Sequence, residues 1–193
     1  MRVITGSARG ARLKAPEGLA TRPTSEMVKE AVFSILQNEI GGAAVLDLFA
    51  GSGQLGIEAL SRGALSCVFV EQDRRAQAVI RENLRHTRLE QGARLVSGDA
   101  LGFLRAGTER FSLALLDPPY GKGLLKTALP LLAGRMEPGG VILCESDRGE
   151  QLPQTAGDFQ LLREYRYGRI KLTLYRMPKG EEDNANSGLP GEL

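Results

Sequence analysis

The chain has 193 residues, of which 42% are hydrophobic and 25% charged, and its formal net charge is +2. This composition is typical of one globular domain, and with only two cysteines it excludes a disulfide scaffold. No apolar run reaches the about 18 residues of a membrane span and no signal-peptide segment opens the chain, so we expect a cytoplasmic protein.

A basic segment opens the chain. Residues 2–15 read as two short strands around a Gly-Ser-Ala-Arg-Gly turn, which predicts a hairpin. Within residues 1–22 only Glu17 opposes the basic side chains, which are Arg2, Arg9, Arg12, Lys14 and Arg22. Such an arm suits a phosphate backbone, although a solvated basic N-terminus is an equally good interpretation.

A helix is predicted next. Thr24 or Ser25 can cap it, its apolar stripe runs from Met27 to Leu36, and Gly41 with Gly42 ends it. Residues 1–40 are therefore expected to form a hairpin-and-helix extension of the main domain.

Apolar runs alternate with helical patterns through residues 41–178. The predicted strands are 44–49, 67–71, 93–98, 111–117, 140–145, 159–167 and 169–176, and the predicted helices are 53–61, 73–84, 101–104 and 124–132. Continuous Val, Leu and Ile runs indicate strands covered on both faces, so we predict a Rossmann-like α/β domain with a seven-stranded, mostly parallel sheet. The last two strands lack a helical crossover and should pair antiparallel, and the polar residues 179–193 should be disordered.

A glycine loop follows the first strand of this domain, in the sequence Asp47-Leu-Phe49-Ala-Gly51-Ser52-Gly53-Gln-Leu-Gly56. Its glycines allow a backbone to approach a ligand closely, and the next helix offers free N–H groups. The spacing also matches the dinucleotide fingerprint, with Glu71 about 20 residues on for a ribose, so a nicotinamide cofactor is an alternative. Asp47 opposes that alternative, because a carboxylate repels a pyrophosphate but suits a ligand with an ammonium group, such as S-adenosylmethionine.

Acidic residues also end the next two predicted strands. Glu71, which Gln72 follows, can accept hydrogen bonds from both hydroxyls of a ribose. Asp99 precedes Ala100 after the third strand, where a helix N-cap is as good an interpretation as a ligand contact. Because ligands of open α/β sheets bind at the carboxyl ends of strands, we expect these acids to surround one cofactor.

The tetrapeptide Asp117-Pro118-Pro119-Tyr120 follows the fourth predicted strand. Two prolines make the turn rigid and remove two N–H donors, which leaves it rich in acceptors. The Asp117 carboxylate and the Pro118 carbonyl can both accept from one amino group, and Tyr120 offers a face on which a flipped-out base can stack. The pattern therefore predicts a site that holds an exocyclic base nitrogen for methyl transfer, with Asp117 able to take the proton.

Two of these motifs resemble those of Rossmann-like methyltransferases that use S-adenosylmethionine. For the glycine loop of residues 47–56, the resemblance implies that Asp47 and the loop hold the methionine part of the cofactor. It also implies that Asp99 and the Ala100 N–H lie at the adenine. Asp117–Tyr120 resembles the signature of amino-methyltransferases that act on DNA adenine, RNA adenine or RNA guanine, so it leaves the base open.

Longer segments make the resemblance closer. Residues 2–10, 22–36, 47–56, 117–120 and 167–175 resemble the bacterial 16S rRNA guanine-N2 methyltransferase family D (RsmD). The resemblance covers residues 1–177 and implies methylation of one guanine (guanine-966 in the family) in the small ribosomal subunit or its assembly intermediate. It also implies that the basic hairpin contacts RNA and that Arg22-Pro-Thr24 lines the site.

Other functions remain open. Adenine N6 in RNA or DNA is an alternative target, although no segment after Tyr120 is left for a DNA-reading domain. A nicotinamide-dependent oxidoreductase and a non-catalytic RNA-binding factor are further alternatives. The single histidine, His86, and the apolar surroundings of Cys67 and Cys144 predict no metal centre, and we expect a monomer.

Overall fold

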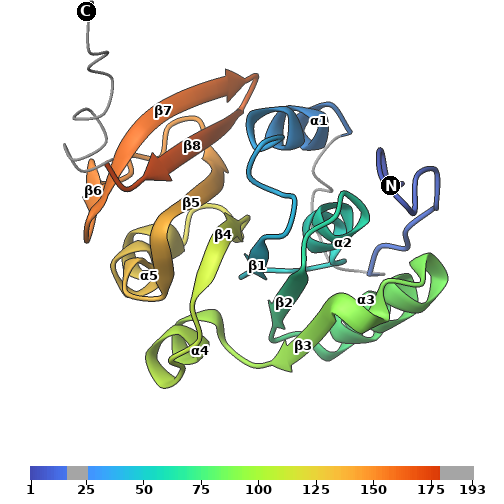
Figure 1. Ribbon diagram of the computed structural model, residues 1–193. Helices are drawn as coiled ribbons and strands as arrows, with labels where there is room; N and C mark the ends of the chain where they lie inside the picture. Colours follow the sequence, from blue (N-terminus) through green and yellow to red (C-terminus); the bar gives the residue numbers. More distant parts are fainter. Residues whose placement is uncertain (17–25, 179–193) are drawn as a thin grey trace, which may run out of the picture.

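The computed structural model describes residues 1–16 and 26–178, and it places them around one eight-stranded sheet (Figure 1). The strand order is β3-β2-β1-β4-β5-β8-β7-β6. The strands are β1 (Ala44–Asp47), β2 (Ser66–Glu71), β3 (Ala93–Ser97), β4 (Phe111–Leu116), β5 (Met136–Asp147), β6 (Thr155–Ala156), β7 (Phe159–Tyr167) and β8 (Ile170–Arg176). The predicted doubly wound α/β fold is confirmed. The count of seven strands is wrong by the short edge strand β6.

Strand direction fixes where a ligand can enter. The strands β1 to β5 are parallel. The chain runs outward from β1 to β2 and β3 and then crosses to β4 on the other side of β1, so the strand order reverses between β1 and β4. This switch point opens a crevice at the carboxyl ends of the central strands. β8 pairs antiparallel with both β5 and β7, as the missing crossover predicted.

Helices cover both faces of the sheet. They are α1 (Glu26–Ile35), α2 (Gln54–Ser61), α3 (Arg74–Thr87), α4 (Ala100–Ala106) and α5 (Leu124–Ala133), with a 3₁₀ turn at Glu90–Gly92. Figure 1 shows α4 and α5 on one face and α1, α2 and α3 on the other. Because side chains alternate along a strand, Val45 packs in the core beneath α1, α2 and α3, while Leu46 packs in the core beneath α4 and α5. In the described residues no helix is long and apolar enough to cross a membrane.

Some element ends differ from the predictions. Helix α1 stops at Ile35, and Gly42, with φ of 73°, instead shapes the turn that leads into β1. β5 extends over Met136–Asp147 because Met136 pairs with Phe111 of β4 and its far end pairs with β8. The caps predicted at Thr24 and Ser25, the RNA contact predicted for Arg22, and the tail 179–193 lie outside the described residues.

The N-terminal segment forms less of the predicted hairpin than expected. Residues 1–16 form only a short antiparallel hairpin around a bridge between Arg2 and Arg12, in which the N–H of Val3 donates to the Ala11 carbonyl at 2.9 Å and the N–H of Leu13 donates to the Met1 carbonyl at 3.0 Å. The backbone N–H groups of Ile4 and Thr5 donate to the Glu58 carboxylate of α2, at 2.8 and 3.0 Å. These two donors therefore bind the main domain, and the segment lies beside α2 and α3 (Figure 1).

Candidate active site

A cavity of about 980 Å³ lies at the carboxyl ends of the parallel strands. It brings together nearly all the residues predicted to bind the cofactor or act on the base. Those that line it are Asp47, Phe49, Gly51, Ser52, Glu71, Gln72, Asp99, Ala100, Asp117, Pro118, Pro119 and Tyr120. Gly53 is the one predicted residue that does not line it.

The three glycines of the loop are required for different physical reasons. Gly51 and Gly53 have φ of 55° and 78°, a left-handed conformation that favours glycine, and α2 begins directly after them. Gly56 is needed for space instead, because a Cβ there would lie 2.3 Å from the Phe69 ring and 2.7 Å from the Cys67 sulfur. The loop thus turns the chain sharply and lets α2 pack closely on β2.

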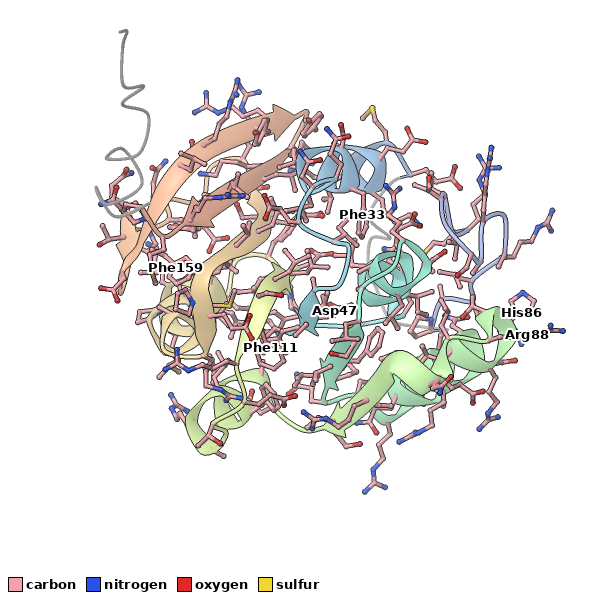
Figure 2. All side chains as sticks on the ribbon, in the orientation of Figure 1. Phe33, Asp47, His86, Arg88, Phe111 and Phe159 are labelled. Carbon is pink, nitrogen blue, oxygen red and sulfur yellow. The ribbon has the colours of Figure 1, made fainter. Side chains whose placement is uncertain are left out.

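Asp47 ends β1 at the base of the cavity, in the centre of the molecule (Figure 2). It is 1% exposed, and its Oδ2 accepts the N–H of Gly56 at 2.9 Å. Burial raises the pKa of Asp47 to about 7, against the lowering effect of the Gly56 hydrogen bond. A cationic group in the cavity would favour the charged form of this carboxylate.

Glu71 ends β2 and organises the loops around it. Its Oε2 accepts the N–H of Gly51 and its Oε1 accepts the N–H of Asp73, each at 2.8 Å. Asp73 in turn caps α3 by accepting the N–H groups of Arg75 and Ala76, which confirms the predicted N-cap. Each Glu71 oxygen keeps a second lone pair, so a ribose contact stays a prediction alongside this structural role.

Asp99 caps α4, because its Oδ2 accepts the N–H of Gly102 at 2.8 Å. The capping interpretation is therefore confirmed, and the adenine contact stays a prediction. Asp99, which is exposed, and the adjacent Ala100, which is buried, both line the cavity.

The Asp117–Tyr120 corner follows β4 on the other side of the cavity. Asp117 and Tyr120 are half-buried, Pro118 is buried and Pro119 is exposed. The Tyr120 hydroxyl donates to Oε1 of Glu145 on β5 at 2.7 Å, and Glu145 is 5% exposed. The sequence analysis missed Glu145, although an acid at the end of the apolar run 140–145 was a signal for it.

The N-terminal segment forms one wall of the cavity through Met1, Ala15 and Pro16, which the sequence analysis also missed. Asn83 of α3 holds this wall. Its side chain accepts from the N–H of Lys14 at 2.8 Å and donates to the carbonyls of Lys14 and Ser52 at 3.0 Å. A polar residue on the apolar face of a predicted helix was the available signal.

The basic residues of the segment lie on its surface. Arg2, Arg9, Arg12 and Lys14 are exposed, with Arg2 paired to Glu26 at 3.2 Å and Lys14 paired to Glu82. Beneath them, Glu58 is fully buried and forms ion pairs with Lys29 and Arg62 at 3.5 and 2.8 Å. Across the described part of the chain, no cluster of His, Cys, Asp and Glu has the makings of a metal site.

Known proteins resemble the chain over nearly its whole length. The model of the family "Conserved hypothetical protein 95" matches residues 1–176. The Bacillus subtilis protein YlbH is 42% identical over 91% of this chain and 98% of its own length. Ribosomal RNA small subunit methyltransferase D of Escherichia coli K12 is 36% identical over 95% of this chain and 93% of its own.

A solved structure gives the same result in three dimensions. The Escherichia coli protein yhhF superposes with a TM-score of 0.80 at 34% identity, over 92% of this chain and 97% of that one. The resemblance inferred from the motifs is thereby confirmed. The chain belongs to the conserved hypothetical protein 95 family, which it shares with the ribosomal RNA small subunit methyltransferases D.

Proposed function

We infer that this protein transfers a methyl group from S-adenosylmethionine to the exocyclic N2 of one guanine in 16S rRNA. The observation that carries the proposal is the single cavity that joins three acid-bearing strand ends to the Asp117–Tyr120 corner. The family supports methyl transfer to ribosomal RNA. The choice of guanine rests on the resemblance of the motifs and is the part to be tested.

The lining fits S-adenosylmethionine better than a dinucleotide. The volume lies within the range of small-molecule sites, and Phe49 and Val70 give it apolar walls. Asp47 suits an ammonium group and Glu71 suits ribose hydroxyls, whereas both would repel a pyrophosphate. When bound, the cofactor supplies an electrophilic methyl group on its sulfonium sulfur.

The residues of the corner hold and orient the amine. The Asp117 carboxylate and the Pro118 carbonyl accept hydrogen bonds from the amino group, which draws its lone pair out of conjugation with the ring. Asp117 also takes the proton that the nitrogen loses. Tyr120, whose hydroxyl donates to Glu145, stacks on the base. Glu145 acts through Tyr120 and is therefore a positioning residue.

The exposed basic residues of the N-terminal segment support an RNA substrate. Arg9 and Arg12 lie on the surface of the same segment whose residues Ala15 and Pro16 line the cavity. Phosphates bound there would lie beside the site. We extend the proposal to the small ribosomal subunit or an assembly intermediate as the substrate. The enzyme would act as a monomer in the cytoplasm.

Methyl transfer to small subunits that lack the modification tests the proposal. We expect radiolabel in the 16S rRNA and N2-methylguanosine in its nuclease digest, and Asp117→Ala should lower the rate by about 100-fold or more. S-adenosylhomocysteine should still bind this variant. Asp158→Ala, an exposed acid in the turn between β6 and β7, is the matched control and should keep the wild-type rate. N6-methyladenosine in the digest, or binding of NAD in place of S-adenosylhomocysteine, would overturn the assignment.

A further inference from the structure

Helix α3 carries a row of exposed arginines that the proposed site does not use. We call Arg74, Arg81, Arg85 and Arg88 the arginine stripe. Arg74, Arg81 and Arg85 are spaced by seven and four residues, which places them within an arc of about 40° on a helix of 3.6 residues per turn, and Arg88 directly follows the last residue of the helix. The face that packs on the sheet carries the buried residues Ala76, Ile80 and Leu84 instead.

The charge of the stripe is mostly uncompensated. Among the described residues, Arg85 alone of the four has a carboxylate within ion-pair distance, at 3.7 Å from Glu90, and both side chains are mostly exposed. The other acid of this helix surface, Glu82, pairs with Lys14. A row of like charges with few counter-charges creates a positive potential that attracts a polyanion.

Two of the four arginines stand at the ends of the helix, Arg74 where its charge is unfavourable and Arg88 where its backbone conformation is unfavourable. Arg74 is the first residue of α3, where the positive end of the helix dipole disfavours a cation. Arg88 follows the helix with φ of 58°, and it is the only non-glycine residue with positive φ in the part of the chain that the structure describes. Glycine is the residue that favours that conformation. Helix formation therefore does not explain Arg74, whereas at Arg88 the favourable charge at the helix C-terminus is set against an unfavourable backbone conformation.

The stripe begins at the rim of the cavity. A hollow of about 500 Å³ is lined by Arg74, Arg81, Gln72, Gln77, Ser97 and Gly98. Gln72 and Gly98 of this hollow also line the main cavity. From there the stripe follows α3 for about 21 Å, at 1.5 Å per residue, to Arg88, which points into solvent at the far end of the helix (Figure 2).

We propose that the arginine stripe binds the sugar–phosphate backbone of the RNA substrate, as a second track beside the basic N-terminal segment. The guanidinium group forms paired hydrogen bonds with phosphate oxygens, and a row of them follows a strand without reading its bases. The stripe thus anchors RNA whose target base enters the cavity next to it. This inference rests on the proposed function, because it names the surface that holds the same substrate.

Binding of unmodified 16S rRNA transcript at a series of salt concentrations tests the stripe. The variant is Arg74→Gln with Arg81→Gln, and the control is Arg105→Gln with Lys126→Gln, which removes the same charge from exposed positions of α4 and α5 on the opposite face. Each phosphate contact steepens the fall of log affinity with log salt concentration by about 0.7. One contact therefore strengthens binding about fourfold at 0.15 M salt relative to 1 M salt. We expect the stripe variant to bind about 14-fold more weakly at 0.15 M with a slope smaller by about 1.4, and the control to change binding less than threefold.

Arg88→Gly separates RNA binding from folding. Glycine relieves the left-handed backbone, so the thermal midpoint should stay or rise while RNA affinity falls about fourfold. S-adenosylhomocysteine affinity should not change in any of these proteins. If the stripe variants bind RNA as tightly as the control while the wild type methylates rRNA, the stripe inference fails and the proposed function stands. If the wild type neither binds nor methylates rRNA, the proposed function fails first.

Discussion

Replacing Asn83 by alanine tests whether the N-terminal segment is an integral wall of the site. The Asn83 side chain is 1% exposed and makes three hydrogen bonds, at 2.8, 3.0 and 3.0 Å, to the backbone of Lys14 and Ser52. At about 1 kcal/mol for each bond, Asn83→Ala should lower the free energy of unfolding by about 3 kcal/mol. For a domain of this size that corresponds to a fall in the thermal midpoint of about 6–12 °C.

The same variant should weaken the cofactor site. Ser52 and Ala15, on either side of the lost hydrogen bonds, both line the cavity, so S-adenosylhomocysteine should bind less tightly by calorimetry. Glu82→Ala is the matched control, because it removes one exposed ion pair next to Asn83 and should change stability by less than about 1 kcal/mol. If Asn83→Ala matched this control in urea unfolding and in ligand affinity, the reasoning would be refuted.

Three further changes test other parts of the site. Because Asp47 has a pKa of about 7 and an ammonium ligand favours its charged form, S-adenosylhomocysteine affinity should fall about tenfold from pH 8 to pH 6; calorimetry should show a flatter profile for Asp47→Asn. Gly56→Ala places a Cβ 2.3 Å from Phe69 and should cost about 1–3 kcal/mol in urea unfolding. Glu58→Gln leaves Lys29 buried without its counter-charge, so the same measurement should show a loss of about 3–5 kcal/mol; a loss below 1 kcal/mol would show that Glu58 does not hold Lys29.

The sheet and the placement of the site could be predicted because their signals are local. Apolar runs such as 67–71 and 111–117 have the length and composition of strands buried on both faces, and the structure places β2 and β4 there. Asp73 was identifiable as an N-cap from its position before a helical pattern. Once the strands were parallel, their carboxyl ends had to share one edge, which brought Asp47 and Asp117 to the same cavity.

The contacts that complete the site come from residues far apart in the sequence. The predicted hairpin of residues 2–15 is shorter than expected, and beyond it the N–H groups of Ile4 and Thr5 bind Glu58, which is more than 50 residues away. Tyr120 and Glu145 meet only because β4 and β5 are neighbours. A local pattern shows that a residue is polar or buried, but the partner that makes this tolerable is set by the tertiary fold.

The acids at the strand ends also show why a structural and a ligand-binding interpretation do not compete. Oδ2 of Asp47 accepts the Gly56 N–H, Oδ2 of Asp99 accepts the Gly102 N–H, and Glu71 receives two backbone donors. A carboxylate has four acceptor positions, so a bond to the following loop or helix fixes its orientation and leaves lone pairs for a ligand. The backbone contacts therefore hold the acids in place before any cofactor arrives, which lowers the conformational entropy that these side chains lose on binding. A cap at such a position is thus part of how the site is built.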